Sequence, residues 1–352
     1  MAQAREQVPL GPLTTLRIGG PARRLVSAAS EEELVEAVAA ADVAGDPMLV
    51  LAGGSNVVIA DDGFDGTVVH VGHGGQREAG EGDGRVLLEA AAGEAWDSFV
   101  AETVAAGLAG IEALSGIPGT VGATPIQNVG AYGQEVASTI ESVRVFDRAA
   151  ARVRTLAPQE CRFGYRTSAL RGDDSLVVLA VTFALDPAGR SPAAYEELAG
   201  ILGVPPGEEA DGSAIREAVL GLRRAKGMVL DPDDHDTWSA GSFFTNPVMG
   251  EKEFAAFAAR ATELGLPEPP RFPAGDGEVK GSAAWCIEKA GFQRGEARGA
   301  VALSGKHVLA LTNRGGATAA ELVGFAREIA GRVQELFGVA LRPEPVLVGL
   351  EW

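Results

Sequence analysis

The stretch at residues 115–133 constrains the fold most, because it combines five glycines and two prolines with almost no charge. Glycine and proline both disfavour a regular helix. Its apolar residues Ile117, Val121, Ile126 and Val129 argue against a solvated linker. A partly buried loop must pair its backbone N–H and C=O groups, and glycines let the main chain approach a ligand closely. The stretch therefore predicts either a turn packed in a core or a cofactor cradle made largely of main chain.

Composition narrows the class of protein. A chain of 352 residues has room for two or three domains. No run of eighteen apolar residues occurs, so no transmembrane helix is expected, and the first twelve residues lack the apolar core of a signal peptide. Cys161 and Cys286 lie far apart, which argues against a disulfide framework. We expect a soluble cytoplasmic protein.

The net charge of −18 argues against nucleic-acid binding, because proteins that bind nucleic acids usually present a basic face. If the ligands are anions, the basic residues must gather where those ligands bind, against the overall field of the protein.

The first half of the chain reads as a mixed unit of strands and helices. Ser30 and Glu33 form a capping box that starts a helix. A buried strand at 48–52 runs into the Gly-Gly-Ser-Asn turn at 53–56. Bare N–H groups and a hydroxyl at a strand end suit a phosphate nest, although a plain β-turn has the same pattern.

The remaining elements follow from periodicity and from helix start and stop signals. Further strands are expected at 57–59, 67–71, 85–90, 142–147, 175–185, 308–313 and 346–349, and helices at 96–106, 192–202, 213–226, 251–264, 283–290 and 318–337. Residues 186–190 mark a domain boundary. The acidic run at 231–236 lacks the spacing of an EF-hand, so a solvated loop is favoured over a metal loop.

Several signatures of common enzyme classes are missing. The sequence has no Rossmann G-x-G-x-x-G, no P-loop, no G-x-S-x-G elbow and no HExxH, and no metal site is expected. Three polar spots remain: Arg166 beside Tyr165, Ser242 between a glycine and two phenylalanines, and Glu344 between two prolines. Taken singly, each could be a surface cation, a helix cap or an exposed turn.

Together, these motifs resemble the UDP-N-acetylenolpyruvoylglucosamine reductase family, flavoenzymes that complete UDP-N-acetylmuramate for peptidoglycan synthesis. The resemblance runs from Thr14 to Gly349 in the family's motif order. The motifs that carry it are residues 53–56, 117–123, 125–128, 130–133, 165–166, 241–244 and 343–344.

The resemblance implies an α+β fold. Residues 14–187 would form an FAD-binding domain of the vanillyl-alcohol-oxidase (PCMH) type with two subdomains, which agrees with the missing Rossmann fingerprint. Residues 188–238 would form a substrate-loop insertion with helices, and residues 239–352 a C-terminal α/β substrate-binding domain.

The resemblance also implies roles for individual residues. Those that would bind FAD, without a covalent bond, are Thr15, Gly53, Gly54, Ser55, Asn56, Gly119, Thr120, Gly122, Ala123, Gln127, Asn128, Gly130, Ala131, Tyr132 and Gly133. Those that would bind substrate are Tyr165, Tyr195, Lys226, Asn246 and Lys289. Tyr195 would belong to a mobile loop, and Lys289 departs from a glutamine that some members carry, which bears on uridine binding.

By the same resemblance, NADPH reduces the flavin, and hydride then passes to the enolpyruvyl group of UDP-N-acetylglucosamine enolpyruvate. Ser242 would protonate the adjacent carbon, while Arg166 and Glu344 would polarise the substrate carboxylate. The protein would be a cytoplasmic monomer acting on small molecules, apart from membranes and nucleic acid, with roles in cell-wall biogenesis, cell shape, cell division and the cell cycle.

Two alternatives stay open. One is another flavin oxidoreductase of the same fold that holds its flavin non-covalently. The other is a catalytically inactive nucleotide-binding protein. A yellow colour that is lost on denaturation would exclude the second, and slow reoxidation by air would disfavour an oxidase.

Overall fold

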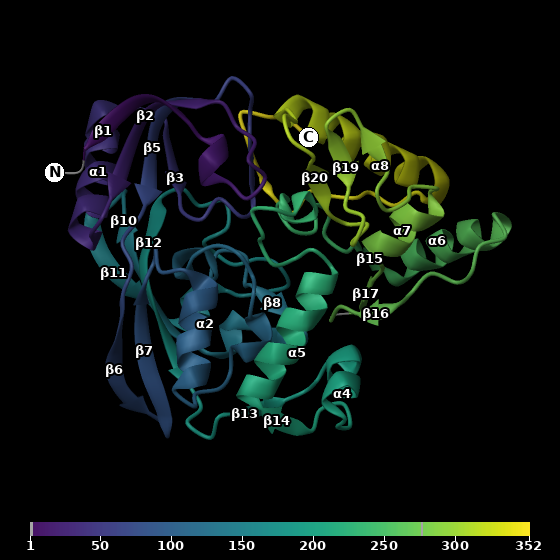
Figure 1. Ribbon diagram of the computed structural model, residues 1–352, viewed down its shortest axis with the longest axis horizontal. Coiled ribbons are helices and arrows are strands. Elements are labelled where there is room, and N and C mark those ends of the chain that lie inside the picture. Colours follow the sequence, from purple (N-terminus) through teal and green to yellow (C-terminus); the bar gives the residue numbers. More distant parts are fainter. Residues whose placement is uncertain (1–2, 276) are drawn as a thin grey trace. The chain divides into compact units, whose positions relative to one another are not determined.

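The computed structural model describes residues 3–275 and 277–352 (Figure 1). The chain divides into two compact units, and neither is one continuous stretch. Unit 1 comprises the chain up to Val8, Ala22–Gly54 and Asp65–Val229, and unit 2 comprises Pro9–Pro21, Ser55–Phe64 and Leu230–Trp352. Strands from distant parts of the sequence pair with one another inside each unit, which is why neither unit is one continuous stretch.

Two sheets form the framework of unit 1. The first has the order β1 (Ala4–Pro9), β2 (Pro21–Ala28), β5 (Phe64–Val71) and β3 (Met48–Leu51), with β3 parallel to β5. The second is antiparallel, with the order β11 (Arg152–Leu156), β10 (Ile140–Asp147), β12 (Leu176–Leu185), β7 (Arg85–Ala91) and β6 (Gln76–Gly82), and its strands run side by side in Figure 1. Shorter pairs are β8 (Gly130–Ala131) with β9 (Gln134–Glu135), and β13 (Arg190–Pro192) with β14 (Glu209–Asp211).

The described residues of unit 1 contain five α-helices and three 3₁₀ turns. The helices are α1 (Glu31–Ala44), α2 (Trp96–Ala105), α3 (Pro158–Cys161), α4 (Glu196–Leu202) and α5 (Gly212–Ala225), with 3₁₀ turns η2 (Glu112–Leu114), η3 (Val121–Ala123) and η4 (Val136–Ser138). The capping prediction for α1 is confirmed, because Ser30 Oγ accepts a hydrogen bond from the Glu33 N–H at 3.2 Å. Gly45 ends α1 with a left-handed φ of 67°.

The core of unit 1 lies between α2 and the second sheet. Trp96 and Phe99 of α2 pack against Phe183 of β12, with ring centroids 5.8 and 5.2 Å away. All three side chains are fully buried, and such tilted aromatic contacts add to the gain from burial. This core places the end of α2, and the glycine-rich stretch that follows it, on a rigid base.

The helix predicted at 192–202 starts later than expected, at Glu196. The segment before it is strand β13, in which Ser191 lies opposite Ala210 of β14. Pro192 lacks an N–H group and suits this short edge strand, while the sheet partner lies too far along the sequence for a local pattern to reveal it.

Unit 2 combines small sheets with three helices in its described residues. The strands are β4 (Val57–Ile59) with β21 (Val346–Val348), β15 (Val248–Gly250) with β17 (Glu278–Lys280) and β16 (Phe272–Pro273), and β18 (Ala297–Arg298) with β19 (Val301–Leu303) and β20 (Leu311–Asn313). The helices are α6 (Glu251–Glu263), α7 (Ala283–Lys289) and α8 (Ala319–Phe337), with 3₁₀ turns η1 (Gly11–Leu13) and η5 (His235–Thr237).

Helix α8 supplies much of the core of unit 2. Thr318 caps it by accepting the Glu321 N–H, and Gly338 ends it with a φ of 72°, so both predicted signals are confirmed. The apolar stripe that includes Leu322, Ile329 and Val333 is buried. Within the described residues, no helix combines the length and apolarity needed to cross a membrane.

The strand predicted at 308–313 is shorter than expected and begins at Leu311. The residues before it form a turn, in which Ala310 donates its N–H to the His307 carbonyl at 3.1 Å. Apolar composition alone did not separate this turn from the strand.

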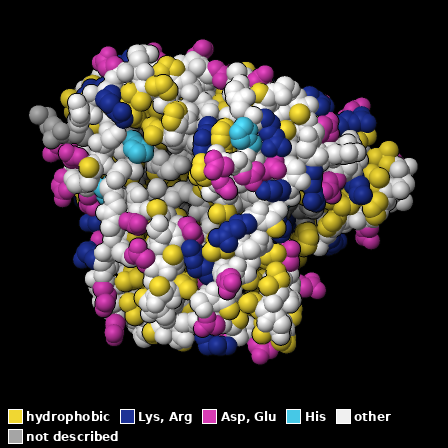
Figure 2. Space-filling view, in the orientation of Figure 1, with side chains coloured by type: hydrophobic (Ala, Val, Ile, Leu, Met, Phe, Trp, Pro, Cys, Tyr) yellow, Lys and Arg dark blue, Asp and Glu magenta, His cyan; other side chains and the backbone are white. Residues whose placement is uncertain are grey.

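The surface charge is distributed. On the face that Figure 2 shows, acidic side chains are interspersed with Lys and Arg. The protein therefore presents Lys and Arg side chains on its surface in spite of its excess of acidic residues, and anionic ligands require such local basic groups.

Candidate active site

The glycine-rich stretch of unit 1 is fixed at its start by charged side chains. Gly116, with a φ of 71°, donates its N–H to Asp97 Oδ1 at 2.6 Å, and its carbonyl accepts a bond from Arg223 Nη2 at 3.3 Å. Arg216 binds the same Asp97 carboxylate with both terminal nitrogens, at 2.6 and 3.2 Å. Burial opposes ionisation of Asp97, but the bonds from Arg216 and Gly116 outweigh it and lower its pKa. Burial of Arg223 lowers the pKa of its guanidinium.

Two glycines allow main chain to meet main chain. A Cβ on Gly53 would lie 2.7 Å from the Cα of Gly119, and one on Gly122 would lie 2.5 Å from the Ala92 Cβ. Real Cβ atoms do not approach so closely, so both positions require glycine. The turn after β3 and the glycine-rich stretch therefore form one packed cradle within unit 1.

This cradle fits a bound cofactor. Thr120 lies in its wall, 9% exposed, and its Oγ1 atom is buried with no hydrogen-bond partner among the described residues. Buried polar groups are normally paired. A ligand with polar groups, such as the phosphates or ribityl hydroxyls of FAD, would supply the missing partner.

The side-chain amide of Asn128 forms hydrogen bonds with other residues of the protein. Its Nδ2 donates to Glu135 Oε2 at 2.8 Å and to the Gly164 carbonyl at 3.1 Å, and its Oδ1 accepts from the Ala137 N–H at 3.2 Å. These bonds hold the backbone of Asn128 at a φ of 46°, a conformation that is rare for most residues but more common for glycine and asparagine. Asn128 thus shapes the cradle, and direct contact with FAD stays a prediction, as it does for Gln127, Ala123 and Gly54.

Arg166 lies on a tight turn that is attached to the cradle. Gly164 and Thr167 close this turn through paired backbone hydrogen bonds of 3.0 and 3.2 Å. Arg166 has a φ of 52°, and its Nη2 donates to the Gly130 carbonyl at 2.6 Å. Its guanidinium lies 5.5 Å from the Tyr165 ring centroid, so these two predicted residues are adjacent. A positive φ is uncommon for a residue other than glycine, so the hydrogen bonds of this turn must hold the backbone in place.

A second basic group of unit 1 lies next to two tyrosines. The rings of Tyr132 and Tyr195 meet edge to face with centroids 5.5 Å apart, and Lys226 Nζ lies 5.9 Å from the Tyr132 centroid. Glu197 pairs with Lys226 at 2.9 Å. Burial acts to lower the pKa of Lys226, but the bond to Glu197 prevails and raises it. The structure thus brings Tyr132, which was predicted to bind FAD, next to Tyr195 and Lys226, which were predicted to bind substrate, and adds Glu197.

Ser242 and Glu344 come from two adjoining segments of unit 2. The Glu344 N–H donates to the Phe243 carbonyl at 2.8 Å, and Phe244 forms a bridge with Pro343. Ser242 therefore precedes the residue whose main chain bonds to Glu344. The predicted acid and the predicted carboxylate are held together by backbone geometry.

The two phenylalanines after Ser242 belong to the core. Phe243 and Phe244 are 1% and 2% exposed, and their rings meet with centroids 5.2 Å apart. Gly241, with a φ of 74°, makes the turn before them. This arrangement buries the aromatic rings and leaves Ser242 half-buried, so the segment is anchored directly after the serine.

Two of the remaining predicted residues of unit 2, Thr15 and Asn246, form side-chain hydrogen bonds within the protein. Thr15 donates its Oγ1 proton to the Ser239 carbonyl at 2.7 Å. Asn246 Oδ1 accepts the N–H of Ala283 at the start of α7, at 3.0 Å. Lys289 lies in the last turn of the same helix. Ser55 and Asn56 are also in unit 2, where the Asn56 carbonyl accepts the Val346 N–H at 3.0 Å.

Three charged or polar residues of the site were missed from the sequence. Asp97 reads as an ordinary acid in the first turn of a helix, and Arg223 as part of a basic helix end. His307 lies 3.4 Å from Ser242 and belonged to no motif. The Asp97 and Arg223 contacts with Gly116 are long-range, so no local signal pointed to them.

Two family models match the chain. One is an FAD binding domain, over residues 22–157, and the other is the C-terminal domain of UDP-N-acetylenolpyruvoylglucosamine reductase, over residues 231–348. A UDP-N-acetylenolpyruvoylglucosamine reductase from Thermobifida fusca is 54% identical over 97% of this chain and 97% of its own length. One from Streptomyces coelicolor is 53% identical over 99% of this chain and 91% of its own.

A solved structure agrees with these relatives. UDP-N-acetylenolpyruvylglucosamine reductase from Thermus caldophilus superposes with a TM-score of 0.64 at 26% identity, and the match covers 99% of each chain. The similarity thus extends over both units.

Proposed function

This chain belongs to the UDP-N-acetylenolpyruvoylglucosamine reductase family, and on that premise we propose how its own residues carry out the reaction. The enzyme is an FAD-containing oxidoreductase that reduces UDP-N-acetylglucosamine enolpyruvate to UDP-N-acetylmuramate in peptidoglycan precursor synthesis, with NADPH as reductant. The adjacency of Ser242 and Glu344 within unit 2 is the observation that carries the assignment of roles.

The cradle of unit 1 would hold FAD. When bound there, FAD would supply the transfer of hydride from NADPH to the enolpyruvyl double bond. Glycines 53, 119 and 122 let the main chain close around the cofactor, and Thr120 Oγ1 gains a partner from it. Binding of this kind is non-covalent, and it uses backbone groups that are already in place before the ligand arrives.

Ser242 and Glu344 would act on the reacting carbons. Hydride addition to one carbon of the double bond leaves negative charge on the other, beside the substrate carboxylate. Ser242 donates its hydroxyl proton to that second carbon, and Glu344 sets the field around the substrate carboxylate. A serine is a weak acid, so its position matters more than its pKa.

Arg166 would bind the substrate carboxylate. A guanidinium offers a planar fork of N–H donors that matches a carboxylate and stabilises the negative charge as it develops. The bond from Nη2 to Gly130 and the strained turn orient this fork before substrate binds. A preorganised cation lowers the barrier because it needs no rearrangement in the transition state.

The UDP part of the substrate would contact the basic and aromatic group of unit 1. Lys226 would be a charge partner for the diphosphate, and the exposed ring of Tyr195 would close over the ligand. We assign Tyr165, Asn246 and Lys289 to the same substrate. We further propose that the enzyme acts as a cytoplasmic monomer and that its product supports cell division and the cell cycle.

Product formation tests this proposal. The purified yellow holoenzyme is mixed with NADPH and UDP-N-acetylglucosamine enolpyruvate, and the lactyl ether product is sought by mass spectrometry. Arg166→Ala and Arg166→Lys are compared with wild type, because a lysine cannot reproduce a bidentate fork. We expect both variants to retain FAD and to lose turnover.

The result that overturns the proposal is a holoenzyme that oxidises NADPH without forming the lactyl ether. Rapid reoxidation by air would then indicate an oxidase of the same fold. Loss of FAD from the Arg166 variants, with their chemistry otherwise intact, would remove Arg166 from the substrate side of the reaction.

A further inference from the structure

Ser242 lies next to a histidine that the reaction scheme leaves unused. The Ser242 Oγ atom and the His307 Nε2 atom are 3.4 Å apart, slightly beyond the usual distance for a hydrogen bond, which is about 2.7–3.2 Å. Catalytic hydrogen bonds are often long before substrate binds. The direction of this bond depends on which ring nitrogen of His307 carries the proton.

The turn that carries His307 is tightly built. Ser304 is fully buried, and its Oγ accepts the N–H groups of Lys306 and His307 at 3.0 and 3.3 Å. Across the turn, the Ser304 N–H donates to the Ala310 carbonyl at 2.8 Å. The backbone of His307 is therefore fixed by the 304–310 turn itself.

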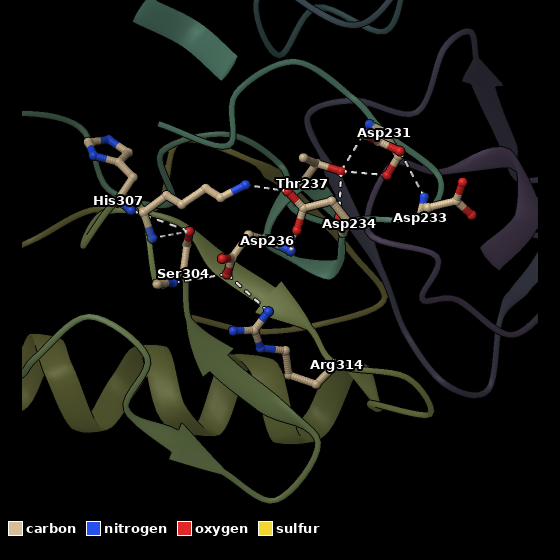
Figure 3. Close-up of polar contacts among 10 residues, drawn as sticks. Asp231, Asp233, Asp234, Asp236, Thr237, Ser304, His307 and Arg314 are labelled. Atoms are coloured by element: carbon tan, nitrogen blue, oxygen red, sulfur yellow. Dashed lines mark hydrogen bonds and ion pairs between the residues drawn. The ribbon is translucent and has the colours of Figure 1, made fainter. Parts of the chain in front are cut away.

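Two acids anchor this turn from outside, as Figure 3 shows for Asp234, Asp236, Ser304 and Arg314. Asp236 Oδ1 accepts the Gly305 N–H at 2.9 Å and pairs with Arg314 at the same distance. Asp234 pairs with the Lys306 ammonium. Asp234 also accepts the Asp236 N–H at 2.9 Å, so the two acids form one structure.

We infer that His307 is a positioning residue for Ser242, that its Nε2–H donates to Ser242 Oγ, and that Asp234 and Asp236 position the turn that carries it. This inference rests on the proposed function, in which Ser242 is the proton donor.

The chemistry explains why His307 must donate. If Nε2 accepted the serine proton, that proton would point at the imidazole and away from the substrate. When Nε2–H donates to Oγ, the serine O–H is free to point at carbon. The O–H bond then breaks as the C–H bond forms, and the negative charge that develops on Oγ is stabilised by the imidazole N–H. Removing one such donor typically costs about 10²–10³-fold in rate.

A stopped-flow comparison of the holoenzymes tests the kinetic consequence. His307→Ala should slow the step in which substrate restores the yellow colour by about 10²-fold, while bleaching by NADPH keeps its rate. His307→Gln offers an amide N–H in place of the imidazole donor and should recover at least part of the loss. Equal rates of colour return in wild type and His307→Ala would overturn the inference.

Substitutions of Asp234 and Asp236, the acids that anchor the turn, test the same inference with smaller expected effects. Asp236→Asn and Asp234→Asn should each slow colour return by a smaller factor without changing bleaching. Asp233→Asn is the matched control, because Asp233 is exposed in the same loop and its carboxylate points away from Ser304 and His307 in Figure 3. An effect of Asp233→Asn as large as that of Asp236→Asn would contradict a specific positioning role.

A measurement without turnover separates this inference from the proposed function. Nitrogen NMR of the histidines in the holoenzyme, without NADPH or substrate, reports which His307 nitrogen is protonated. A protonated Nε2 whose signal shifts in Ser242→Ala supports the inference, and a bare Nε2 overturns it. Failure of the wild type to form the lactyl ether would instead overturn the proposed function.

Discussion

The carboxylate of Asp97 accepts a hydrogen bond from the backbone N–H of Gly116, with 2.6 Å between Oδ1 and N. Arg223 bonds to the carbonyl of the same glycine. Both backbone polar groups at the start of the FAD cradle are thus held by charged side chains, which ties the cradle to helices α2 and α5.

Removing this acceptor should weaken FAD binding. Asp97→Ala leaves the Gly116 N–H without its partner, a loss of about 1–3 kcal/mol, or roughly 5- to 150-fold in affinity if the whole effect falls on binding. Flavin fluorescence during titration of the apoprotein measures the Kd. Asp97→Asn is the control, because an amide oxygen still accepts the bond. Equal Kd values for Asp97→Ala and wild type would contradict the prediction.

Gly53→Ala should abolish FAD retention. The new Cβ would lie 2.7 Å from the Gly119 Cα, so one of two packed backbones must move. The ratio of flavin to protein absorbance after purification measures the effect. Gly200→Ala is the matched control in helix α4, where nothing lies within 4 Å of the new Cβ, and it should gain up to about 1 kcal/mol in stability. A fully loaded Gly53→Ala protein would refute the packing argument.

Ser242→Ala should lose about 10²–10⁴-fold in turnover, the usual range for general acid catalysis. The fold should be unaffected, because Ser242 is half-buried and the rings of Phe243 and Phe244 anchor the segment. In a stopped-flow trace, the yellow colour should disappear with NADPH at the wild-type rate and return slowly with substrate. If bleaching is the slowed phase, Ser242 does not act as the acid.

Glu197→Gln should tighten binding of the UDP-sugar severalfold. Glu197 pairs with Lys226 at 2.9 Å and so competes with a diphosphate for that ammonium. Calorimetric titration with UDP measures the change. Glu196→Gln neutralises the adjacent exposed acid of α4 and is the control. Weaker binding in Glu197→Gln would mean that the acid orients Lys226 instead of competing for it.

The Asp234–Lys306 pair should give a pH-dependent contribution to stability. The hydrogen bond from Lys306 lowers the pKa of Asp234 below its usual value, and the bond from Asp234 raises the pKa of Lys306. A lowered carboxyl pKa stabilises the fold above the unfolded pKa, and a raised ammonium pKa stabilises it below the unfolded pKa.

Asp234→Asn should therefore lower the free energy of unfolding between about pH 5 and pH 9. The difference should vanish as the pH falls through the lowered pKa of Asp234. Because both side chains are about one-third exposed, the contribution should stay below about 1 kcal/mol. Urea unfolding at several pH values measures it, and a difference that persists under strong acid would exclude this pair as its cause.

Local chemistry made much of the fold predictable. The capping residues Ser30 and Thr318 and the stop at Gly338 act within one helical turn, so the sequence pattern contains the whole signal. The strand at Val57–Ile59 could likewise be predicted from its apolar run. Strand β13 could not, because its partner β14 is supplied by the fold.

The residues of the candidate site also divide into those that a local sequence pattern could predict and those that it could not. Arg166, Ser242 and Glu344 were predicted because each stands in an unusual local setting of glycine, aromatic or proline residues. Asp97 and His307 stand in ordinary settings, and their roles arise from contacts with Gly116 and Ser242 across long stretches of chain. Side chains that act by holding another residue leave little trace in a single sequence.

The parallel pairing of β4 and β21 has a consequence for synthesis at the ribosome. Val57 of β4 lies opposite Val346 of β21, so nearly the whole chain must be made before this pair can close. Unit 2 also draws on Pro9–Pro21, whereas unit 1 contains no residue beyond Val229. Domains generally fold as units while the chain emerges. The nascent protein would therefore carry β4 as an unpaired edge until Val346–Val348 are made, and a stop codon before Val346 would leave that edge unpaired permanently.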